Sequence, residues 1–285
     1  FTDFKEDKIR VFTALICFII AWALLRGSPT SVAYNEDLFW GGGHVLQMVN
    51  ALLMLTAWVV LGKIALETPL LPAGTFRLAT GIVILAGVAA VGLYGVFDMD
   101  SGELREAHSK LKFFLALPTA LVGLAAWPAL IRGLKAGAWR NPAFIALILS
   151  MSLFAIGGVM GFFVDGTDTR TPGHYHAVLG AVNLSFFGLV MFYFLPLLGR
   201  DLKANRWRMA PLYIYALGQL LQSIGMFVAA APRKTMGQAQ MLDTAVQRFG
   251  MELNKNGALI AVIGGILFVW IVGRALLRRS PSNAT

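Results

Sequence analysis

Apolar residues follow one another in long runs along most of the chain, and polar residues gather in the short connections between the runs. Each run is about long enough to cross a bilayer as a helix, which takes roughly 20 apolar residues. No repeat, low-complexity tract or linker divides the series, so we expect a single membrane domain over residues 1–285. The predicted spans are 9–26, 38–62, 76–98, 111–133, 142–164, 174–198, 209–231 and 256–277. The pattern therefore predicts an all-α fold, a polytopic membrane helix bundle of about eight transmembrane helices.

The composition agrees with a membrane environment. Hydrophobic residues make up 57% of the 285 residues and charged residues only 14%, and a soluble domain of that composition would expose large apolar patches. The first run is short, but it has no small-residue cleavage site before Arg26, so we expect a retained helix rather than a signal peptide. The only cysteine, Cys17, lies in this run, which excludes a disulfide framework or thiolate cluster within the chain. The longest connection, 232–255, contains a predicted amphipathic stretch over 241–253.

The 24 Lys and Arg residues are distributed unevenly between alternate connections. Most of them fall on the side of the N-terminus, and most acidic residues fall on the opposite side. Because cytoplasmic loops carry an excess of Lys and Arg, both termini are predicted to face the cytoplasm, in an arrangement typical of a bacterial inner membrane. The net charge of +9 is then a topology signal, and no nucleic acid partner is needed to explain it.

This orientation places all four histidines toward the outer, periplasmic face. His44 lies near the outer end of the second predicted span, and His174 and His176 open the sixth. His108 precedes the fourth span among charged residues, where we expect a solvated loop histidine, and it is left out of the primary site.

His174 and His176 are candidates for cofactor ligands. Two residues of an α-helix are separated by about 200°, so the two imidazoles point to opposite faces and cannot share one metal ion. They could serve two different cofactors. The alternative is a pair of hydrogen-bonded histidines at the membrane interface, but ionisable residues inside a membrane more often mark function, which favours ligation.

His44 follows Gly41-Gly42-Gly43, three residues without side chains. A flat macrocycle or another helix could approach the backbone closely there. The sequence leaves both interpretations open: a ligand beside a macrocycle, or a hydrogen-bonded histidine in close helix packing. Elsewhere the spans hold almost no acidic residue, which argues against a proton-coupled transporter or a self-contained proton pump.

The order of these motifs resembles subunit I of the heme-copper oxidases. Residues 38–45, LFWGGGHV, are similar to the "LFW…GHPEVY" that opens helix VI of that family, where the histidine ligates copper. Residues 157–196 are similar to "GGLTG…AHFHYVL…FP", in which the first histidine binds the high-spin heme and the second the low-spin heme. Residues 117–119 match the "IPT" of helix VIII, and 231–234 match the "MPRR" after helix XI. The collinear matches imply the fold of the C-terminal part of subunit I, helices V to XII.

The sequence also departs from the family. The paired copper-binding histidines of helix VII would fall near Leu93-Tyr94, where there are none. The tyrosine of the copper-site motif is replaced near Met48, and the lysine after "IPT" is missing around Val122 to Leu124. The family's first four helices have no counterpart in this sequence. The resemblance therefore does not extend to a copper centre or to ordinary oxygen reduction with proton pumping.

What the resemblance implies is a set of heme-iron ligands, His44, His174 and His176, and a b-type heme. In one hypothesis His44 and His174 ligate the same iron from its two sides, which suits electron transfer because no coordination position stays open. The predicted function is a heme-binding membrane subunit of a respiratory or oxidative complex, with other membrane subunits, quinol or cytochrome c as partners. The alternatives are a divergent oxygen or nitric oxide reductase completed by a partner chain, and a structural or assembly subunit without cofactor.

Overall fold

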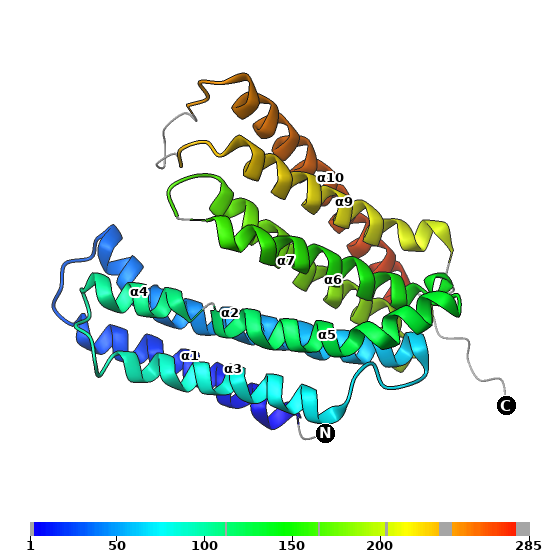
Figure 1. The fold of residues 1–285 in the computed structure, drawn as a ribbon, viewed down its shortest axis with the longest axis horizontal. Coiled ribbons are helices and arrows are strands. Elements are labelled where there is room, and N and C mark those ends of the chain that lie inside the picture. The colour runs from blue at the N-terminus through cyan, green and yellow to red at the C-terminus, as the bar shows by residue number, and fades with distance from the viewer. Residues whose placement is uncertain (1–2, 112, 165, 203–204, 234–240, 278–285) are drawn as a thin grey trace. The chain divides into compact units, whose positions relative to one another are not determined.

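The computed structural model describes residues 3–111, 113–164, 166–202, 205–233 and 241–277, although the side chains of 3–11 and 206 are not described. Within these ranges the secondary structure is helical, with no strand beyond one isolated bridge between Asp168 and Pro232 (Figure 1). The principal helices are α1 (Asp3–Leu24), α2 (Val32–Leu66), α3 (Ala73–Leu93), α4 (Gly102–Lys110), α5 (Phe113–Lys135), α6 (Pro142–Met160), α7 (Arg170–Leu189), α9 (Arg206–Ala229) and α10 (Ala245–Leu277). Shorter turns are η1 (Ala138–Arg140), η2 (Gly161–Phe163), η3 (Val190–Phe194) and α8 (Leu195–Leu197). The all-α membrane fold is confirmed.

Seven helical segments of the described chain are long and apolar enough to cross a membrane. They coincide with the last seven predicted spans. The first predicted span corresponds to α1, of which Phe12–Leu24 forms a shorter apolar helix. Two boundaries differ from prediction. The fourth span is preceded by a separate helix, α4, and α10 begins at Ala245, so most of the stretch predicted as a separate amphipathic segment is the first part of one long helix.

The chain divides into two compact units, and the division falls inside α2 and α5. Unit 1 comprises residues 1–56 and 71–129, and unit 2 comprises 57–70 and 130–285. His44 and His108 therefore belong to unit 1, and His174 and His176 to unit 2.

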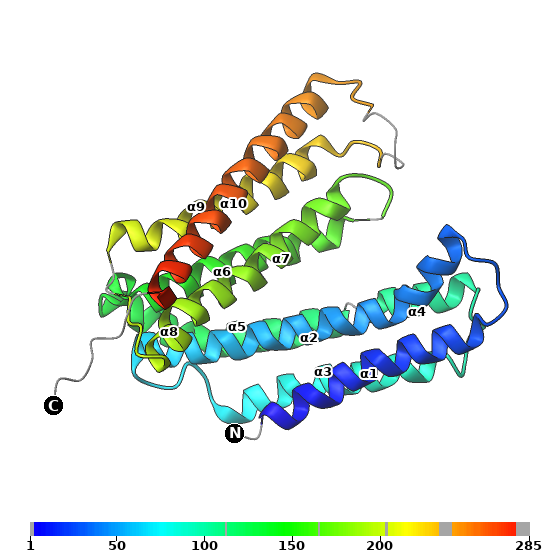
Figure 2. The ribbon, with the colours of Figure 1, turned by 180° about the vertical axis from the view of Figure 1, so that it is seen from behind.

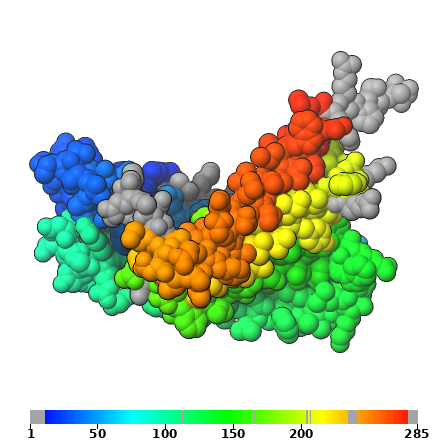
Figure 3. Space-filling model, turned by 90° about the horizontal axis from the view of Figure 1, so that it is seen from above, coloured from blue at the N-terminus to red at the C-terminus, as the bar shows by residue number. Residues whose placement is uncertain are grey.

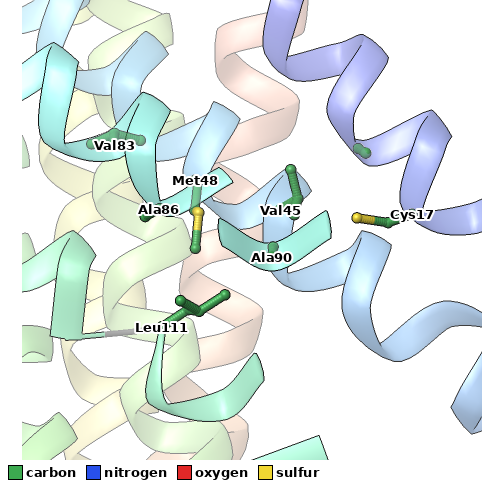
Figure 4. Close-up of a cluster of buried hydrophobic side chains, with 8 residues drawn as sticks. Cys17, Val45, Met48, Val83, Ala86, Ala90 and Leu111 are labelled. Atoms are coloured by element: carbon green, nitrogen blue, oxygen red, sulfur yellow. The ribbon is translucent and has the colours of Figure 1, made fainter. Parts of the chain in front are cut away.

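The core of unit 1 is a cluster of small and medium-sized side chains from α1, α2 and α3 (Figure 4). Cys17 of α1 lies near Val45 of α2 and Ala90 of α3. The other members of the cluster are Ala14, Met48, Val83, Ala86 and Leu111. Alanine at the crossing points lets the helices approach closely, because within a membrane van der Waals packing, rather than exclusion of water, holds helices together. Cys17 is fully buried here and takes part as an apolar residue.

Unit 2 is built on close contacts of α6 with α7, α7 with α9 and α9 with α10 (Figures 1 and 2). A buried hydrogen-bond chain links three of its segments: Trp58 Nε1 donates to Ser150 Oγ over 2.8 Å, and Ser150 Oγ donates to the Ala181 carbonyl over 2.7 Å. Each buried polar atom in this chain is thereby satisfied, as an apolar surrounding requires.

Glycines set the spacing of α9 and α10, which lie side by side along their length (Figure 3). A Cβ added at Gly250 would lie 2.6 Å from the Ala229 nitrogen, and one at Gly264 would lie 2.6 Å from the Tyr215 nitrogen. Gly218, Gly225 and Gly257 meet backbone atoms of the facing helix in the same way. The two backbones touch directly, so any side chain at these positions would push the helices apart.

Prolines lie within several helical segments of the described chain. Pro118 and Pro128 are inside α5, and Pro196 follows η3, a π-helical turn over Val190–Phe194. Proline lacks an N–H and its ring crowds the carbonyl four residues earlier. A π-turn just before Pro196 provides the extra room, so the helix continues into α8 rather than ending.

Candidate functional site

Three of the four histidines share one hydrogen-bonding arrangement. The Nδ1 atom of His44 lies 2.7 Å from the Trp40 carbonyl, that of His108 lies 3.0 Å from the Leu104 carbonyl, and that of His174 lies 2.7 Å from the Gly157 carbonyl. A backbone carbonyl can only accept, so Nδ1 is the donor in each ring and Nε2 carries the lone pair. Such a hydrogen bond is how proteins fix the tautomer and orientation of a metal-ligating imidazole.

His174 is held between α6 and α7. Its ring packs over Gly161, where an added Cβ would lie 2.9 Å from the imidazole Cε1 atom. Gly157 provides the carbonyl that orients the ring, and an added Cβ there would lie 2.9 Å from the Ala177 Cβ. Both glycines belong to the motif that resembles "GGLTG", and their role here is to let α7 and the imidazole approach α6. Gly158, between them, faces open space.

The start of α7 is hydrogen-bonded to the end of α9, and this fixes the position of the helical turn that carries His174 and His176. Thr169 Oγ1 donates to the Met226 carbonyl over 2.8 Å and accepts from the Ala231 N–H over 3.0 Å. The Arg233 N–H donates to the Thr167 carbonyl over 3.2 Å. The described part of the segment that resembles "MPRR" therefore packs against the residues preceding His174, whereas Lys234 lies outside the described residues.

His176 points away from His174, as the helical spacing predicts. His174 contacts α6, whereas the Nε2 atom of His176 lies 3.4 Å from the Gln222 side-chain amide nitrogen on α9. Because an amide N–H can only donate, Nε2 is the acceptor in this long hydrogen bond. The lone pair that a metal would need at His176 is thus directed at Gln222.

The surroundings of His44 combine the two interpretations left open above. The ring is half-buried and lies 5.2 Å from the Trp40 ring, centroid to centroid. Gly41 and Gly42 serve close packing of protein side chains, since an added Cβ would meet Tyr94 and His108 at Gly41 and Phe18 at Gly42. Gly43 faces open space. His44 is thus hydrogen-bonded beside a close helix contact and has the tautomer that a metal ligand requires, and its ligation of a heme stays a prediction.

The prediction of a solvated His108 is wrong. Its side chain is only 1% exposed, on α4, with Leu104 buried one turn before it. Ser101 caps this helix by accepting from the Leu104 N–H over 3.1 Å. The missed signal was the cap followed by Leu104, His108 and Leu111, which recur every three or four residues and form one buried face. Surrounding charges at Glu103 and Lys110 hid that periodicity.

The donor groups do not fit a copper centre. No group of three or more His, Cys, Asp or Glu side chains in the described ranges lies close enough to hold a metal ion. At the positions of the family's copper-binding pair, Leu93 and Tyr94 present an alkyl side chain and a phenol in place of two imidazoles. The Nε2 atom of His108 lies near the same point as the Tyr94 hydroxyl, since a Cβ added at Gly41 would meet both atoms.

Whether the residues present fit a heme depends on the orientation and tautomer of each histidine. His174 fits a heme ligand, because its ring is oriented by a backbone carbonyl and its tautomer puts the lone pair on Nε2, the atom that would hold the iron. An apolar groove of about 390 Å³ lies in unit 2, lined by Ala155, Ile156, Val159, Met160, Phe163 and Phe227. It contains no histidine. Since His44 and His174 belong to different units, their ligation of one iron stays a prediction.

Comparison with known proteins supports the relationship that the motifs imply. No family model matches the chain. An uncharacterized protein of Rickettsia prowazekii is 22% identical over 321 residues, which covers 94% of this chain and 62% of that protein. An uncharacterized protein of Aquifex aeolicus is 27% identical over 185 residues, 65% of this chain and 45% of that protein. Cytochrome c oxidase subunit 1 of Thermus thermophilus is 25% identical over 299 residues, 93% of this chain and 52% of that protein.

Among solved structures, a chain of a heme-copper terminal oxidase dimer superposes with a TM-score of 0.71 at 20% identity, covering 98% of this chain and 58% of that chain. The architecture is therefore that of an integral membrane protein with the heme-copper oxidase fold. Together with the similarity to subunit 1 along nearly the whole chain, this makes the protein heme-copper oxidase subunit I-like. The chain spans about half to three fifths of the length of the curated relatives it matches.

Proposed function

We propose that this protein is a heme-binding membrane subunit of a respiratory or oxidative complex and that His174 ligates the heme iron through Nε2. The observation that carries the proposal is the 2.7 Å hydrogen bond from His174 Nδ1 to the Gly157 carbonyl. The imidazole ring lies beside Gly161, which has no side chain to displace it. A bound heme supplies one-electron transfer, and the protein's part is to orient the imidazole and exclude water around it. His44 has the same tautomer and would be the second ligand of the iron.

His176 has a different role in this proposal. Its Nε2 atom accepts from Gln222, so it ties α7 to α9 and holds the helix that carries His174. A second heme at His176 would require the Gln222 amide to turn away. With both termini in the cytoplasm the histidines lie toward the periplasmic face of an inner membrane, where quinol or a cytochrome c is the expected electron donor.

The test is a reduced-minus-oxidised spectrum with pyridine hemochrome quantification on the purified protein. His174→Ala is expected to lose the heme, whereas Tyr175→Ala, its half-exposed neighbour, is expected to keep it. A wild-type protein that binds no heme after verified loading would contradict the proposal and favour a structural or assembly subunit.

Carbon monoxide binding separates electron transfer from ligand chemistry. If His44 is the second axial ligand, the reduced wild type will not bind carbon monoxide and His44→Ala will, because the substitution opens a coordination position. Carbon monoxide binding by the wild type would instead favour an oxygen or nitric oxide reductase.

A further inference from the structure

Two buried polar atoms in unit 1 lie beside the same glycine of α2. The hydroxyl of Tyr94 and the Nε2 atom of His108 are both inaccessible to solvent and have no hydrogen-bond partner among the described protein atoms. Both approach the same point of the α2 backbone, since a Cβ added at Gly41 would collide with the Tyr94 hydroxyl and lie 2.7 Å from His108 Nε2. The two rings lie 5.2 Å apart, centroid to centroid.

One of the two atoms is a hydrogen-bond acceptor and the other a donor, but they are not hydrogen-bonded to each other. His108 Nδ1 donates to the Leu104 carbonyl, so Nε2 is an acceptor. The Tyr94 hydroxyl is a donor with no acceptor in reach. The Ala90 backbone also interacts with the imidazole, but Nε2 makes no hydrogen bond of ordinary length and angle to it. Leaving a buried donor or acceptor unmatched costs about 1–3 kcal/mol, so two such atoms side by side indicate a polar ligand between them.

The space and the charge around these atoms limit what that ligand is. A cavity of about 10 Å³ lies beside Gly41, Tyr94 and His108, and one water molecule requires about 10–15 Å³ measured in this way. Asp37 and Arg105 line the same cavity, and Arg105 Nε donates to Asp37 Oδ1 over 2.7 Å. Their charges neutralise each other, so the cavity favours neither a cation nor an anion.

We propose that Tyr94, His108 and the backbone at Gly41 form a binding site for one water molecule. The water accepts from the Tyr94 hydroxyl and donates one hydrogen to His108 Nε2, and the Asp37 carboxylate at the cavity wall is the acceptor for its second hydrogen. It thereby joins α3, α4 and α2 through a polar contact in a unit whose core is otherwise apolar. The site needs no heme, so it is independent of the function proposed above.

Substitutions at Tyr94 and His108 are expected to change the thermal unfolding midpoint differently, depending on whether the site holds a water molecule. Tyr94→Phe removes the hydroxyl, and His108→Asn keeps a donor for the Leu104 carbonyl while removing Nε2. If the water is bound, each variant leaves a hydrogen bond unmade, and the thermal unfolding midpoint in detergent falls by about 2–4 °C. If the site is dry, Tyr94→Phe removes an unmatched buried hydroxyl, and the midpoint stays or rises. Tyr213→Phe, at an exposed tyrosine, is the matched control and should not change it.

The double variant and a direct measurement complete the test. Because both side chains would bind one water, the combined loss in Tyr94→Phe/His108→Asn should be smaller than the sum of the single losses. A cryo-EM map of the full chain, at a resolution that shows other buried waters, should contain one water density between the two atoms. Strict additivity, a direct hydrogen bond between Tyr94 and His108, or a metal ion at this point by elemental analysis would each overturn the proposal. The map decides the matter even where a variant fails to fold.

Discussion

His174 Nδ1 lies 2.7 Å from the carbonyl oxygen of Gly157, seventeen residues earlier and on the facing helix. The bond does two things at once, because it ties α7 to α6 and selects the tautomer with the lone pair on Nε2. It depends on small residues on α6, since the imidazole occupies the volume that a side chain at Gly161 would take.

Gly161→Ala is expected to displace the His174 ring. The new Cβ would lie 2.9 Å from the imidazole Cε1 atom, and such overpacking costs about 1–3 kcal/mol. Gly158→Ala, three residues earlier and within α6, meets open space and is the matched control. The thermal unfolding midpoint should fall for Gly161→Ala and not for Gly158→Ala. The heme-to-protein ratio of the loaded protein should also fall for Gly161→Ala alone. Equal behaviour of the two variants would mean that the ring does not depend on Gly161.

Gly264→Leu is expected to separate α9 from α10. A Cβ at this position would lie 2.6 Å from the Tyr215 nitrogen, so the backbones must part or the side chain cannot be placed. The adjacent Gly265→Leu meets nothing within 4 Å and should be tolerated in the membrane. The yield of folded protein after detergent extraction, measured by size-exclusion chromatography, distinguishes the two. A stable Gly264→Leu would contradict the direct backbone contact.

Ser150→Ala breaks the hydrogen-bond chain of unit 2 at its centre. It leaves the Trp58 indole N–H without an acceptor in a buried position, and we expect a loss of about 1–3 kcal/mol in the free energy of unfolding. Ser152→Ala, on an exposed position of the same helix, should change little. If the cost comes from the unmatched indole, adding Trp58→Phe to Ser150→Ala should cost less than Trp58→Phe costs alone in the wild type.

The predicted orientation can be tested with single engineered cysteines, because the native Cys17 is fully buried and should not react. Glu103→Cys, before α5, should react with a membrane-impermeant maleimide added outside intact cells. Ala136→Cys, between α5 and α6, should react only after the membrane is opened. Both positions are exposed in the structure, so a negative result reports the side of the membrane and not burial. The reverse pattern would invert the topology derived from the Lys and Arg distribution.

Run length and helical spacing determined most of the architecture from the sequence alone. The predicted spans coincide with α2, α3, α5, α6, α7, α9 and α10 because roughly 20 apolar residues are a local requirement for crossing a bilayer. The opposite directions of His174 and His176 also follow locally, from the rotation of about 200° over two helical residues. Gly157 and Gly161 carry no side chain, and the structure shows that α7 and His174 lie in the space beside them.

Only the tertiary structure decided which polar groups are buried and what they contact. His108 sits among charged residues in the sequence, yet it packs against Gly41 on α2, and the Trp40 indole donates to the Arg105 carbonyl 65 residues away. Gly41 and Gly42 accommodate side chains from α1, α3 and α4, whereas Gly43 faces open space, a difference that three identical residues in a row cannot reveal. Hydrophobicity is a property of each segment, but burial of a polar atom depends on partners that folding brings from distant parts of the chain. That is why the spans could be read from the sequence and the environments of the histidines could not.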